Sequence, residues 1–339
     1  MSAPRVTPAA PLAIGPLTLG GQTVLAPMSG ISDWPFRFIA ARFGAPLVVS
    51  EMVPSERLVA ADALSAIKTE GRGIVPHAVQ LAGCRADVLA QGARIAEDGG
   101  AHLIDINMGC PAKKVFGGFA GSALMGDLDH ATRLIEAVVG AVRVPVTVKM
   151  RLGLCAHSHN AAELARRAEG AGAALVTVHG RTRAQKYKGC ADWAAVAPVV
   201  QAVGIPVIVN GDCTGIDDAR KMLRASGAAG VMVGRATLGA PWRVAQIDAA
   251  LMGRAAPAVP QTPAAIAAIA AEHFALMRET VPARLATRLF KKHLAAYADH
   301  FALPAPLRQM ALTAEDAAAT AAAIGPLFAA AEPTVQAAA

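Results

Sequence analysis

Short apolar runs alternate with amphipathic stretches along the chain from about residue 24 to residue 250. The apolar runs are rich in β-branched residues and are bounded by polar or glycine-containing turns, which is typical of buried strands. We predict eight strands, at Val24–Ala26, Leu47–Ser50, Val75–Gln80, His102–Asn107, Val146–Met150, Leu175–His179, Val207–Asn210 and Gly230–Val233. We predict helices between them, most clearly at Asp87–Glu97, Asp129–Val142, Ala161–Ala171 and Asp217–Ala225.

Eight alternating strand and helix units predict a (β/α)8 TIM barrel over residues 16–250. A doubly wound open sheet is the alternative for such an alternation. The dinucleotide-binding pattern Gly-x-Gly-x-x-Gly does not follow the first predicted strand, which disfavours the open sheet. The barrel is therefore the predicted fold.

The pattern changes after about residue 250. Residues 251–263 are rich in proline and alanine and are predicted to form a linker. Helical patterns follow at Ala264–Thr280, Ala283–Phe301 and Ala314–Ala323, which predicts a small C-terminal helical domain over residues 264–331. We expect disordered segments at residues 1–15 and 332–339.

The ends of the predicted strands carry polar or reactive groups. In TIM barrels the active site lies at the carboxyl ends of the strands. In chain order these ends hold Pro27-Met28, Glu51-Met52, Gln80, Asn107 with Cys110, Lys149, His179, Asn210-Gly211-Asp212 and Gly234-Arg235. Such a concentration at strand ends predicts an active site at the barrel mouth.

Cys110 follows one of these strands, just after Asp105 and Asn107, which share a side-chain parity. Gly109 and Pro111 favour a turn that leaves the Cys110 thiol at the mouth. A thiol with a near-normal pKa is mostly protonated at neutral pH and can donate a proton. The alternative is a small, buried, apolar cysteine. The polar groups at the other strand ends favour the proton donor.

The last two strand ends favour a phosphate-bearing ligand. Loops after the seventh and eighth strands of a barrel often bind phosphate through the N–H groups of a glycine-containing turn, and Arg235 adds a cation. A phosphorylated cofactor such as FMN suits this arrangement. Lys149 at the mouth would stabilise a negatively charged reduced flavin. Alternatively, Lys149 could form an ion pair with Asp105, and the two roles are compatible.

Charge and cysteine usage narrow the class of protein. The net charge of +7 favours a polyanionic partner. The five cysteines are odd in number and never form a Cys-x-x-Cys pair, which favours a reducing cytoplasm over a disulfide scaffold, an iron–sulfur site or a zinc site. Cys155, His157 and His159 alternate in one loop, so a metal site there is a minor alternative. We expect no metal, and no apolar run is long enough to span a bilayer.

Several motifs together resemble those of the bacterial tRNA-dihydrouridine synthases, most closely the B-type branch. The similar stretches cover essentially the whole predicted barrel. They are Ala26 to Arg37, Asp105 to Val115, Ala120 to Leu124, Val148 to Arg151, His179 to Arg183, Asn210 to Asp212 and Gly234-Arg235. Phe290 to Leu294 is similar to the helical domain of that family.

The resemblance implies an FMN-bearing barrel and a helical tRNA-binding domain. The family reduces particular uridines of tRNA to 5,6-dihydrouridine, usually with NADPH as electron source. By resemblance, Asn107 would position the uracil and Cys110 would protonate C5 after hydride from the reduced flavin N5 reaches C6. The resemblance assigns the cofactor to Pro27, Met28, Ser29, Gln80, Lys149, His179, Asn210, Gly211, Asp212, Gly234 and Arg235.

A tRNA substrate gives a role to basic residues outside the mouth, because Arg and Lys contacts to phosphate position an RNA without reading its sequence. The predicted contacts are Lys113, Lys114, Arg181 and Arg183 beside the strand ends, and Arg284, Arg288, Lys291 and Lys292 at helical spacing in the C-terminal domain. An ordinary solvated helix face is the other reading of the second group. We expect a monomer.

Two other functions stay open. An FMN-dependent oxidoreductase of free pyrimidines, of the dihydroorotate dehydrogenase type, would use a similar barrel, a strand-end Asn and a nearby Cys. An RNA-binding protein without redox activity would use the basic residues alone and would be colourless. The additional helical domain favours the tRNA substrate over the first, and the strand-end chemistry favours an enzyme over the second.

Overall fold

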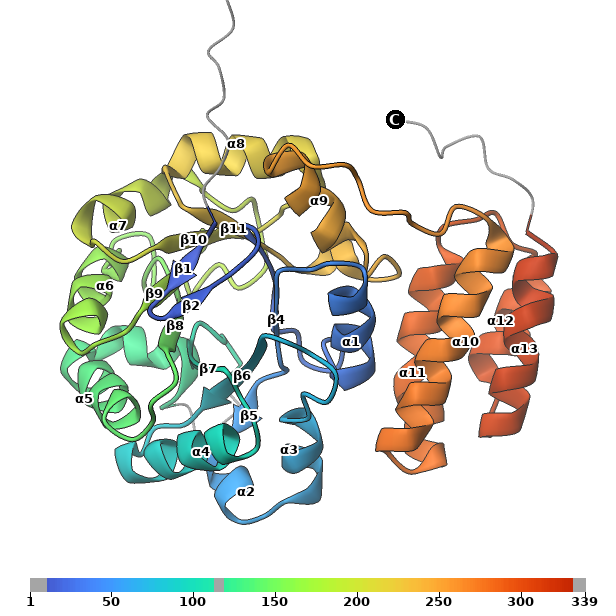
Figure 1. Cartoon of the computed structure of the whole chain (residues 1–339), viewed down its shortest axis with the longest axis horizontal. Coiled ribbons are helices and arrows are strands. Elements are labelled where there is room, and N and C mark those ends of the chain that lie inside the picture. Colours follow the sequence, from blue (N-terminus) through green and yellow to red (C-terminus); the bar gives the residue numbers. More distant parts are fainter. Residues whose placement is uncertain (1–10, 113–118, 332–339) are drawn as a thin grey trace, which may run out of the picture.

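A computed structural model of the chain describes residues 11–112 and 119–331 and contains the predicted barrel. Its eight parallel strands are β3 (Thr23–Leu25), β4 (Leu47–Val49), β6 (His77–Ala82), β7 (Leu103–Met108), β8 (Val146–Arg151), β9 (Leu175–His179), β10 (Val207–Asn210) and β11 (Gly230–Val233). Pairing of β4 with β6 and of β11 with β3 closes the ring (Figure 1). The predicted fold class is confirmed.

A ring of helices surrounds the strands: α1 (Trp34–Arg42), α4 (Ala86–Asp98), α5 (Leu128–Val139), α6 (Ala161–Gly170), α7 (Ala197–Ala202), α8 (Ile216–Ser226) and α9 (Arg243–Leu251). Three short elements after β4 were not predicted, namely β5 (Val53–Pro54), α2 (Ser55–Val59) and α3 (Ala63–Lys68). Each is too short to show a period in the sequence. The strand predicted at Val75–Gln80 lies two residues later.

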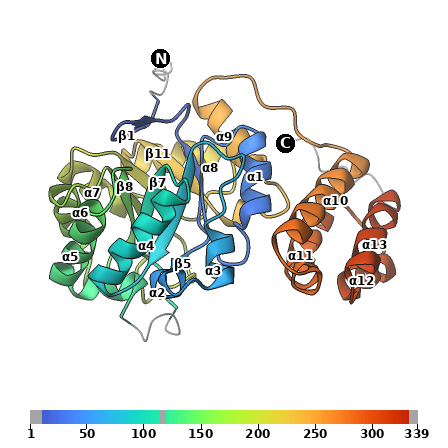
Figure 2. The ribbon, with the colours of Figure 1, turned by 60° about the horizontal axis from the view of Figure 1, so that its bottom comes forward.

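The N-terminal hairpin closes the end of the barrel opposite the carboxyl ends of the strands. Strands β1 (Ala13–Ile14) and β2 (Leu17–Thr18) pair antiparallel, and Figure 2 shows them at one end of the barrel. Ile14 is fully buried against the apolar barrel interior. The expectation of disorder through residue 15 is therefore corrected, because burial of Ile14 orders the segment from Ala13 onward. Residues 1–10 lie outside the described residues.

The C-terminal domain is a bundle of α10 (Pro263–Thr280), α11 (Ala283–Ala298), α12 (Ala305–Thr313) and α13 (Ala317–Ala329). Helix α12 was not predicted from the sequence. A proline in its first turn is compatible with helix because the first amides need no intrahelical acceptor. Residues 252–262 connect α9 to α10, and residues 332–339 lie outside the described part. No helix of the described residues is long and apolar enough to cross a membrane.

The helical bundle packs closely against the barrel beside α1 (Figures 1 and 2). Trp242 of the barrel belongs to the same apolar cluster as Phe290 and Tyr297 of α11. At Gly239 the two backbones nearly touch, because a Cβ there would lie 2.2 Å from the Ala296 carbonyl oxygen. Glycine is therefore required at this contact, where its φ of +67° is also unfavourable for other residues.

Asp33 joins the two domains. Its Oδ1 accepts a hydrogen bond from Phe36 N (3.0 Å) and so caps α1. Its carboxylate also faces His273 of α10 and His293 of α11, with nitrogen–oxygen distances of 3.6 and 3.5 Å. Burial raises the pKa of Asp33, but the two imidazoles more than offset this and hold it well below its usual value. The carboxylate is therefore ionised between two buried histidines.

We predict that Asp33→Ala lowers the free energy of unfolding by about 2–3 kcal/mol, because it removes a helix cap and leaves two buried imidazoles without the carboxylate that they face. Asp62→Ala is the matched control, since Asp62 caps α3 through Ser65 N (2.8 Å) and its charged neighbours, Arg57 and Lys68, belong to the barrel. Urea unfolding of both variants gives the comparison. Equal losses in the two variants would show that Asp33 acts only as a cap.

Candidate active site at the barrel mouth

A cavity of about 860 Å³ opens at the carboxyl ends of the barrel strands. Every residue predicted to be catalytic, to bind the cofactor or to position the pyrimidine lines it. These residues are Pro27, Met28, Ser29, Gln80, Asn107, Cys110, Lys149, His179, Asn210, Gly211, Asp212, Gly234 and Arg235. The structure thus brings together side chains from seven of the eight barrel strands or from the loops that follow them.

A buried polar layer forms the floor of this cavity, above the apolar interior of the barrel. The strand register places Asp105 between Gln80 on one side and Thr147 on the other. Gln80 Nε2 and Thr147 Oγ1 donate to the two carboxylate oxygens of Asp105 at 2.7 and 2.6 Å. Burial raises the pKa of Asp105 to about 6, although these donors and Lys149 oppose the shift.

The loop that carries Cys110 is held on two sides. Asn107 Oδ1 accepts hydrogen bonds from Cys110 N (2.9 Å) and Gly109 N (3.2 Å). The Cys110 carbonyl accepts from both the amide and the hydroxyl of Ser122, each at 2.9 Å. A Cβ at Gly121 would lie 2.7 Å from the Cys110 carbonyl oxygen, so only glycine allows this approach. The thiol is partly exposed in the cavity wall.

Cations dominate the cavity. Lys149 is 9% exposed, and burial together with repulsion from Arg151 lowers its pKa to about 8, against the attraction of Asp105. Within the described ranges no hydrogen-bond acceptor meets the Lys149 ammonium. Burial and the surrounding cations lower the pKa of His179 to about 2, which keeps its imidazole neutral. The site therefore favours an anionic ligand.

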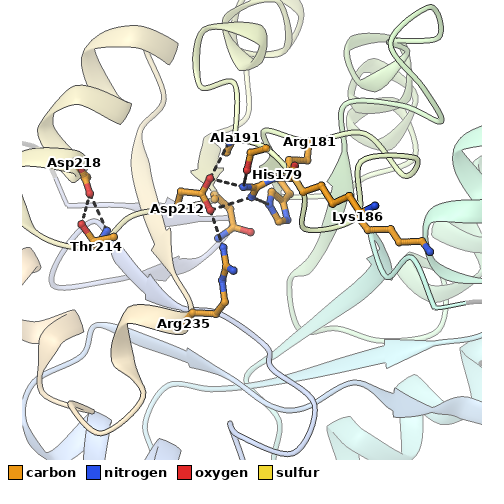
Figure 3. A network of polar contacts seen from close by, with 12 residues as sticks. His179, Arg181, Lys186, Ala191, Asp212, Thr214, Asp218 and Arg235 are labelled. Carbon is orange, nitrogen blue, oxygen red and sulfur yellow. Dashed lines mark hydrogen bonds and ion pairs between the residues drawn. The ribbon is translucent and has the colours of Figure 1, made fainter. Parts of the chain in front are cut away.

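Asp212 organises the phosphate-binding candidates at the ends of β9, β10 and β11 (Figure 3). It accepts hydrogen bonds from Arg181 (2.5 and 3.0 Å), Arg235 (2.8 Å) and Ala191 N (2.8 Å). Partial burial raises the pKa of Asp212, but these partners hold it below its usual value. A Cβ at Gly211 would lie 2.7 Å from Ala191 Cβ, so the turn needs glycine there.

Arg181 is corrected from a substrate contact to an internal brace. It is 1% exposed, and its guanidinium donates to the carbonyls of Lys188 and Gly189 and to Asp212. It also donates to His179 Nε2 (3.2 Å), which fixes that nitrogen as the acceptor because a guanidinium only donates. These bonds occupy the group, so it is not available to RNA phosphates.

The other basic residues divide into three groups. Arg183, Arg284, Arg288 and Lys291 are exposed or partly exposed. Lys292 is half-buried and points back to the barrel, because a Cβ at Gly30 would lie 2.6 Å from its Nζ. Lys292 therefore lies at the domain junction, and its contact with RNA stays a prediction. Lys113 and Lys114 lie outside the described residues.

The cavity residues missed by the sequence reasoning include one cation, Arg151, and one aromatic ring, Tyr187. Arg151 donates to the Gly109 carbonyl (2.7 Å) and so supports the loop before Cys110. Its guanidinium lies 5.7 Å from the ring centre of Tyr187, which is 61% exposed. Arg151 directly follows the predicted end of its strand, and this position could have identified it as a site residue. Tyr187 lies in an irregular loop, and the sequence gives no signal for it.

Side chains of metal-ligand type gather at the domain junction and not in the loop singled out by the sequence. Within residues 11–112 and 119–331, Cys155, His157 and His159 do not form a ligand set. Asp33, His273 and His293 do, with their ligand atoms all within 4.8 Å, and their place between the domains accounts for them structurally. The expectation that the protein needs no metal stays a prediction.

A second cavity, of about 440 Å³, lies between the barrel and the helical domain. Ser29 lines both cavities, so the two are neighbours at the β3–α1 loop. Its walls include Trp34, Leu285 and Leu289, and Arg57 and Arg288 add cations. This groove leads from the mouth toward the basic face of α11.

We predict that Lys149→Met stabilises the unliganded protein at pH 7 by up to about 3 kcal/mol, because a lysine whose pKa is lowered on folding costs stability while it is charged. The cost is present below pH 8 and vanishes above the unfolded pKa of about 10.4, so the gain should shrink toward pH 10.5. Urea unfolding at both pH values measures it, with Lys221→Met on exposed α8 as control. A Lys149→Met protein less stable at pH 7 would contradict the prediction.

Comparison with known proteins places the chain in a family. The family model "Dihydrouridine synthase (Dus)" matches residues 24–332. A probable tRNA-dihydrouridine synthase of Rhodobacter capsulatus is 50% identical over 319 residues, covering 94% of this chain and 98% of its own. The tRNA-dihydrouridine synthase B of Pseudomonas syringae pv. tomato is 41% identical over 286 residues, 84% of each chain.

Solved structures with the same fold are far more distant in sequence. The 6-hydroxypseudooxynicotine amine oxidase of Pseudomonas geniculata N1 has a TM-score of 0.56 at 13% identity, covering 72% of this chain and 49% of its own. Histamine dehydrogenase of Rhizobium sp. 4-9 has a TM-score of 0.53 at 12% identity, covering 76% and 52%. At such identity the likeness concerns the fold alone. On the family match and the relatives at 41–50% identity, the chain belongs to the dihydrouridine synthase family.

Proposed function

We propose that this protein is a tRNA-dihydrouridine synthase that reduces the C5=C6 bond of particular uridines in tRNA, with FMN as cofactor and NADPH as electron donor. The observation that carries the proposal is the cavity at the barrel mouth, in which a thiol, an amide and a set of cations converge. Family membership and the names of the relatives support tRNA as the substrate.

The residues present fit FMN. Lys149, without a hydrogen-bond acceptor among the described residues, can meet a negatively charged ring edge. Arg235, 66% exposed at its side chain, can turn from Asp212 to a phosphate, and the glycine turn at Gly211 allows close backbone approach. The cavity volume lies in the range of cofactor sites. Bound FMN, once reduced, would supply a hydride for uracil C6.

The chain's own residues would supply the rest of the chemistry. Saturating the bond needs one hydride and one proton, and the Cys110 thiol can donate the proton to C5. Asn107 would hold the pyrimidine through its amide, while its Oδ1 keeps Cys110 in place. The closed hydrogen bonding of the Cys110 loop supports a fixed donor position.

The tRNA would lie across both domains. Its target uridine must leave the stack to enter the mouth. The groove between the domains, the exposed Arg284 and Arg288 and the partly exposed Lys291 of α11 supply cations for the neighbouring phosphates. Because the bundle packs closely on the barrel, these cations stand at a fixed distance from Cys110.

The function is tested with purified protein, NADPH and tRNA that lacks dihydrouridine. Mass spectrometry of the digested tRNA should show uridine converted to dihydrouridine, and the protein should be yellow from bound flavin. If the protein oxidised dihydroorotate rapidly and left the uridines of tRNA unreduced, it would instead be an oxidoreductase that acts on free pyrimidines. A colourless preparation without activity would favour an RNA-binding protein.

We predict that Cys110→Ala lowers the rate of dihydrouridine formation by at least about 100-fold, since it removes the proton donor. Binding of FMN and tRNA should be unchanged, because other residues bind those two ligands. Cys155→Ala is the matched control, with a cysteine of similar exposure outside the cavity. Full activity of Cys110→Ala would refute the proton-donor role.

We predict that replacing Arg284, Arg288 and Lys291 by alanine weakens tRNA binding at low salt. The slope of log K against log salt should fall by about one for each phosphate that these side chains neutralise. Alanine at the exposed Arg220, Lys221 and Arg224 of α8 is the control, since it also removes three positive charges, away from the groove. Filter binding at four salt concentrations measures the slope. An unchanged slope would assign these residues to an ordinary solvated face.

A further inference from the structure

A chain of hydrogen bonds runs under Cys110 from the buried Asp105 to the loop backbone. Gln80 Nε2 donates to Asp105 Oδ2 (2.7 Å), and Asn107 Nδ2 donates to Gln80 Oε1 (2.8 Å). Asn107 Oδ1 then accepts from the amides of Gly109 and Cys110. Gln80, Asp105 and Asn107 are 1%, 3% and 7% exposed, so the chain of bonds is almost completely shielded from solvent.

We propose that Asp105 is a positioning residue for the reduction: its carboxylate sets the direction of the hydrogen bonds through Gln80 and Asn107 and thereby fixes the Cys110 loop. The proposal rests on the proposed function for its catalytic consequence. Asp105 itself touches neither Cys110 nor the space for the pyrimidine, since it does not line the cavity. It acts only through the two side-chain amides, and we call the three residues together the Asp105 relay.

The direction of the relay follows from what each group can do. An ionised carboxylate only accepts, so it requires the NH2 end of Gln80. The oxygen end of Gln80 then faces Asn107 and requires its NH2 end. That leaves the Asn107 oxygen for the loop, where the two backbone N–H groups can only donate. The carboxylate at one end and the backbone N–H groups at the other therefore require the same orientation of both amides. If either amide turned over, its NH2 group would face another donor.

Loss of the acceptor at Asp105 would therefore change the position of the Cys110 loop. A buried donor without a partner costs far more than one exposed to water, and water has little access to this layer. Gln80 would have to turn toward another acceptor, and Asn107 would lose the partner that holds its oxygen on the loop. Lys149, paired with Asn107 in the strand register, and Thr147 both favour the ionised form of Asp105.

The relay also leaves one N–H donor for the pyrimidine. One hydrogen of Asn107 Nδ2 is used by Gln80, and the second is free for a ligand in the cavity that Asn107 lines. A fixed N–H donor suits a carbonyl oxygen and disfavours an amino group. Uracil offers carbonyl oxygens at both C2 and C4, whereas cytosine carries an amino group at C4. The direction set by Asp105 therefore suits a carbonyl oxygen of uracil, at C2 or at C4.

Three variants at the end of the relay separate direction from charge. Asp105→Leu removes the acceptor and should lower kcat by about 10–100-fold, the loss typical of a small misplacement of a reacting group. Asp105→Asn keeps an acceptor for Gln80, because the Thr147 hydroxyl can turn to accept from the new NH2, and should lose less than about tenfold. Thr147→Val is the control, since it removes a donor to the same carboxylate and leaves the relay whole.

A second measurement reads the Cys110 loop without tRNA or activity. The rate of iodoacetamide alkylation at each cysteine is followed by peptide mass spectrometry in the flavin-free full-length chain. Asp105→Leu should change the rate at Cys110 several-fold, because the loop is released, and Asp105→Asn should not. The exposed Cys190 is the reference for reagent, and the buried Cys213 reports unfolding. If Asp105→Leu does not fold, Gln80→Met cuts the same relay and is read by this measurement alone.

The expected result is a low kcat and altered Cys110 alkylation in Asp105→Leu, with tRNA affinity unchanged because the phosphate contacts lie elsewhere. Unchanged kcat and alkylation in Asp105→Leu would overturn the proposal. Equal losses in Asp105→Leu and Asp105→Asn would also overturn it, since the charge rather than the direction would then matter. Failure of the proposed function is distinct: the wild-type chain would leave tRNA unreduced, and the alkylation rates would still test the relay.

Discussion

Closure of eight parallel strands is the constraint on which the rest of the structure depends. A parallel barrel sends every strand end to the same mouth, so residues far apart in the chain become neighbours there. The interior below is apolar, and the hairpin of β1 and β2 covers the opposite end. Polar side chains such as Gln80, Asp105 and Lys149 are buried toward the mouth, where a ligand or another polar side chain can meet them.

Burial of this polar layer costs free energy of folding, but it also orders the barrel mouth. Asp105 and Lys149 both have pKa values shifted toward their neutral forms by burial. Each polar group of the floor holds another in place, which pre-orders the mouth before a substrate arrives. The β3–α1 loop extends this order outward, since Ser29 lines the cavity and Asp33 meets the histidines of the helical domain.

The sequence predicted the strands and the strand-end chemistry well because both depend on local pattern. Buried parallel strands read as β-branched runs, and their ends are marked by glycine and polar residues. What it missed depends on three-dimensional proximity. Arg181 looks like a free cation in the sequence, but Asp212 and two carbonyls enclose it. Lys292 lies in a regular basic stripe, yet the position of the barrel turns it toward Gly30. No periodicity encodes either contact.

Dihydrouridine mapped at each position of tRNA from cells with and without the protein shows whether the mouth of this barrel reduces uridines in tRNA. We expect particular uridines to carry the mass of two additional hydrogen atoms when the protein is present, and to be ordinary uridine in its absence. Complementation with the gene should restore them at the same positions. Identical dihydrouridine maps in the two cell types, with no other enzyme able to modify those positions, would contradict the account.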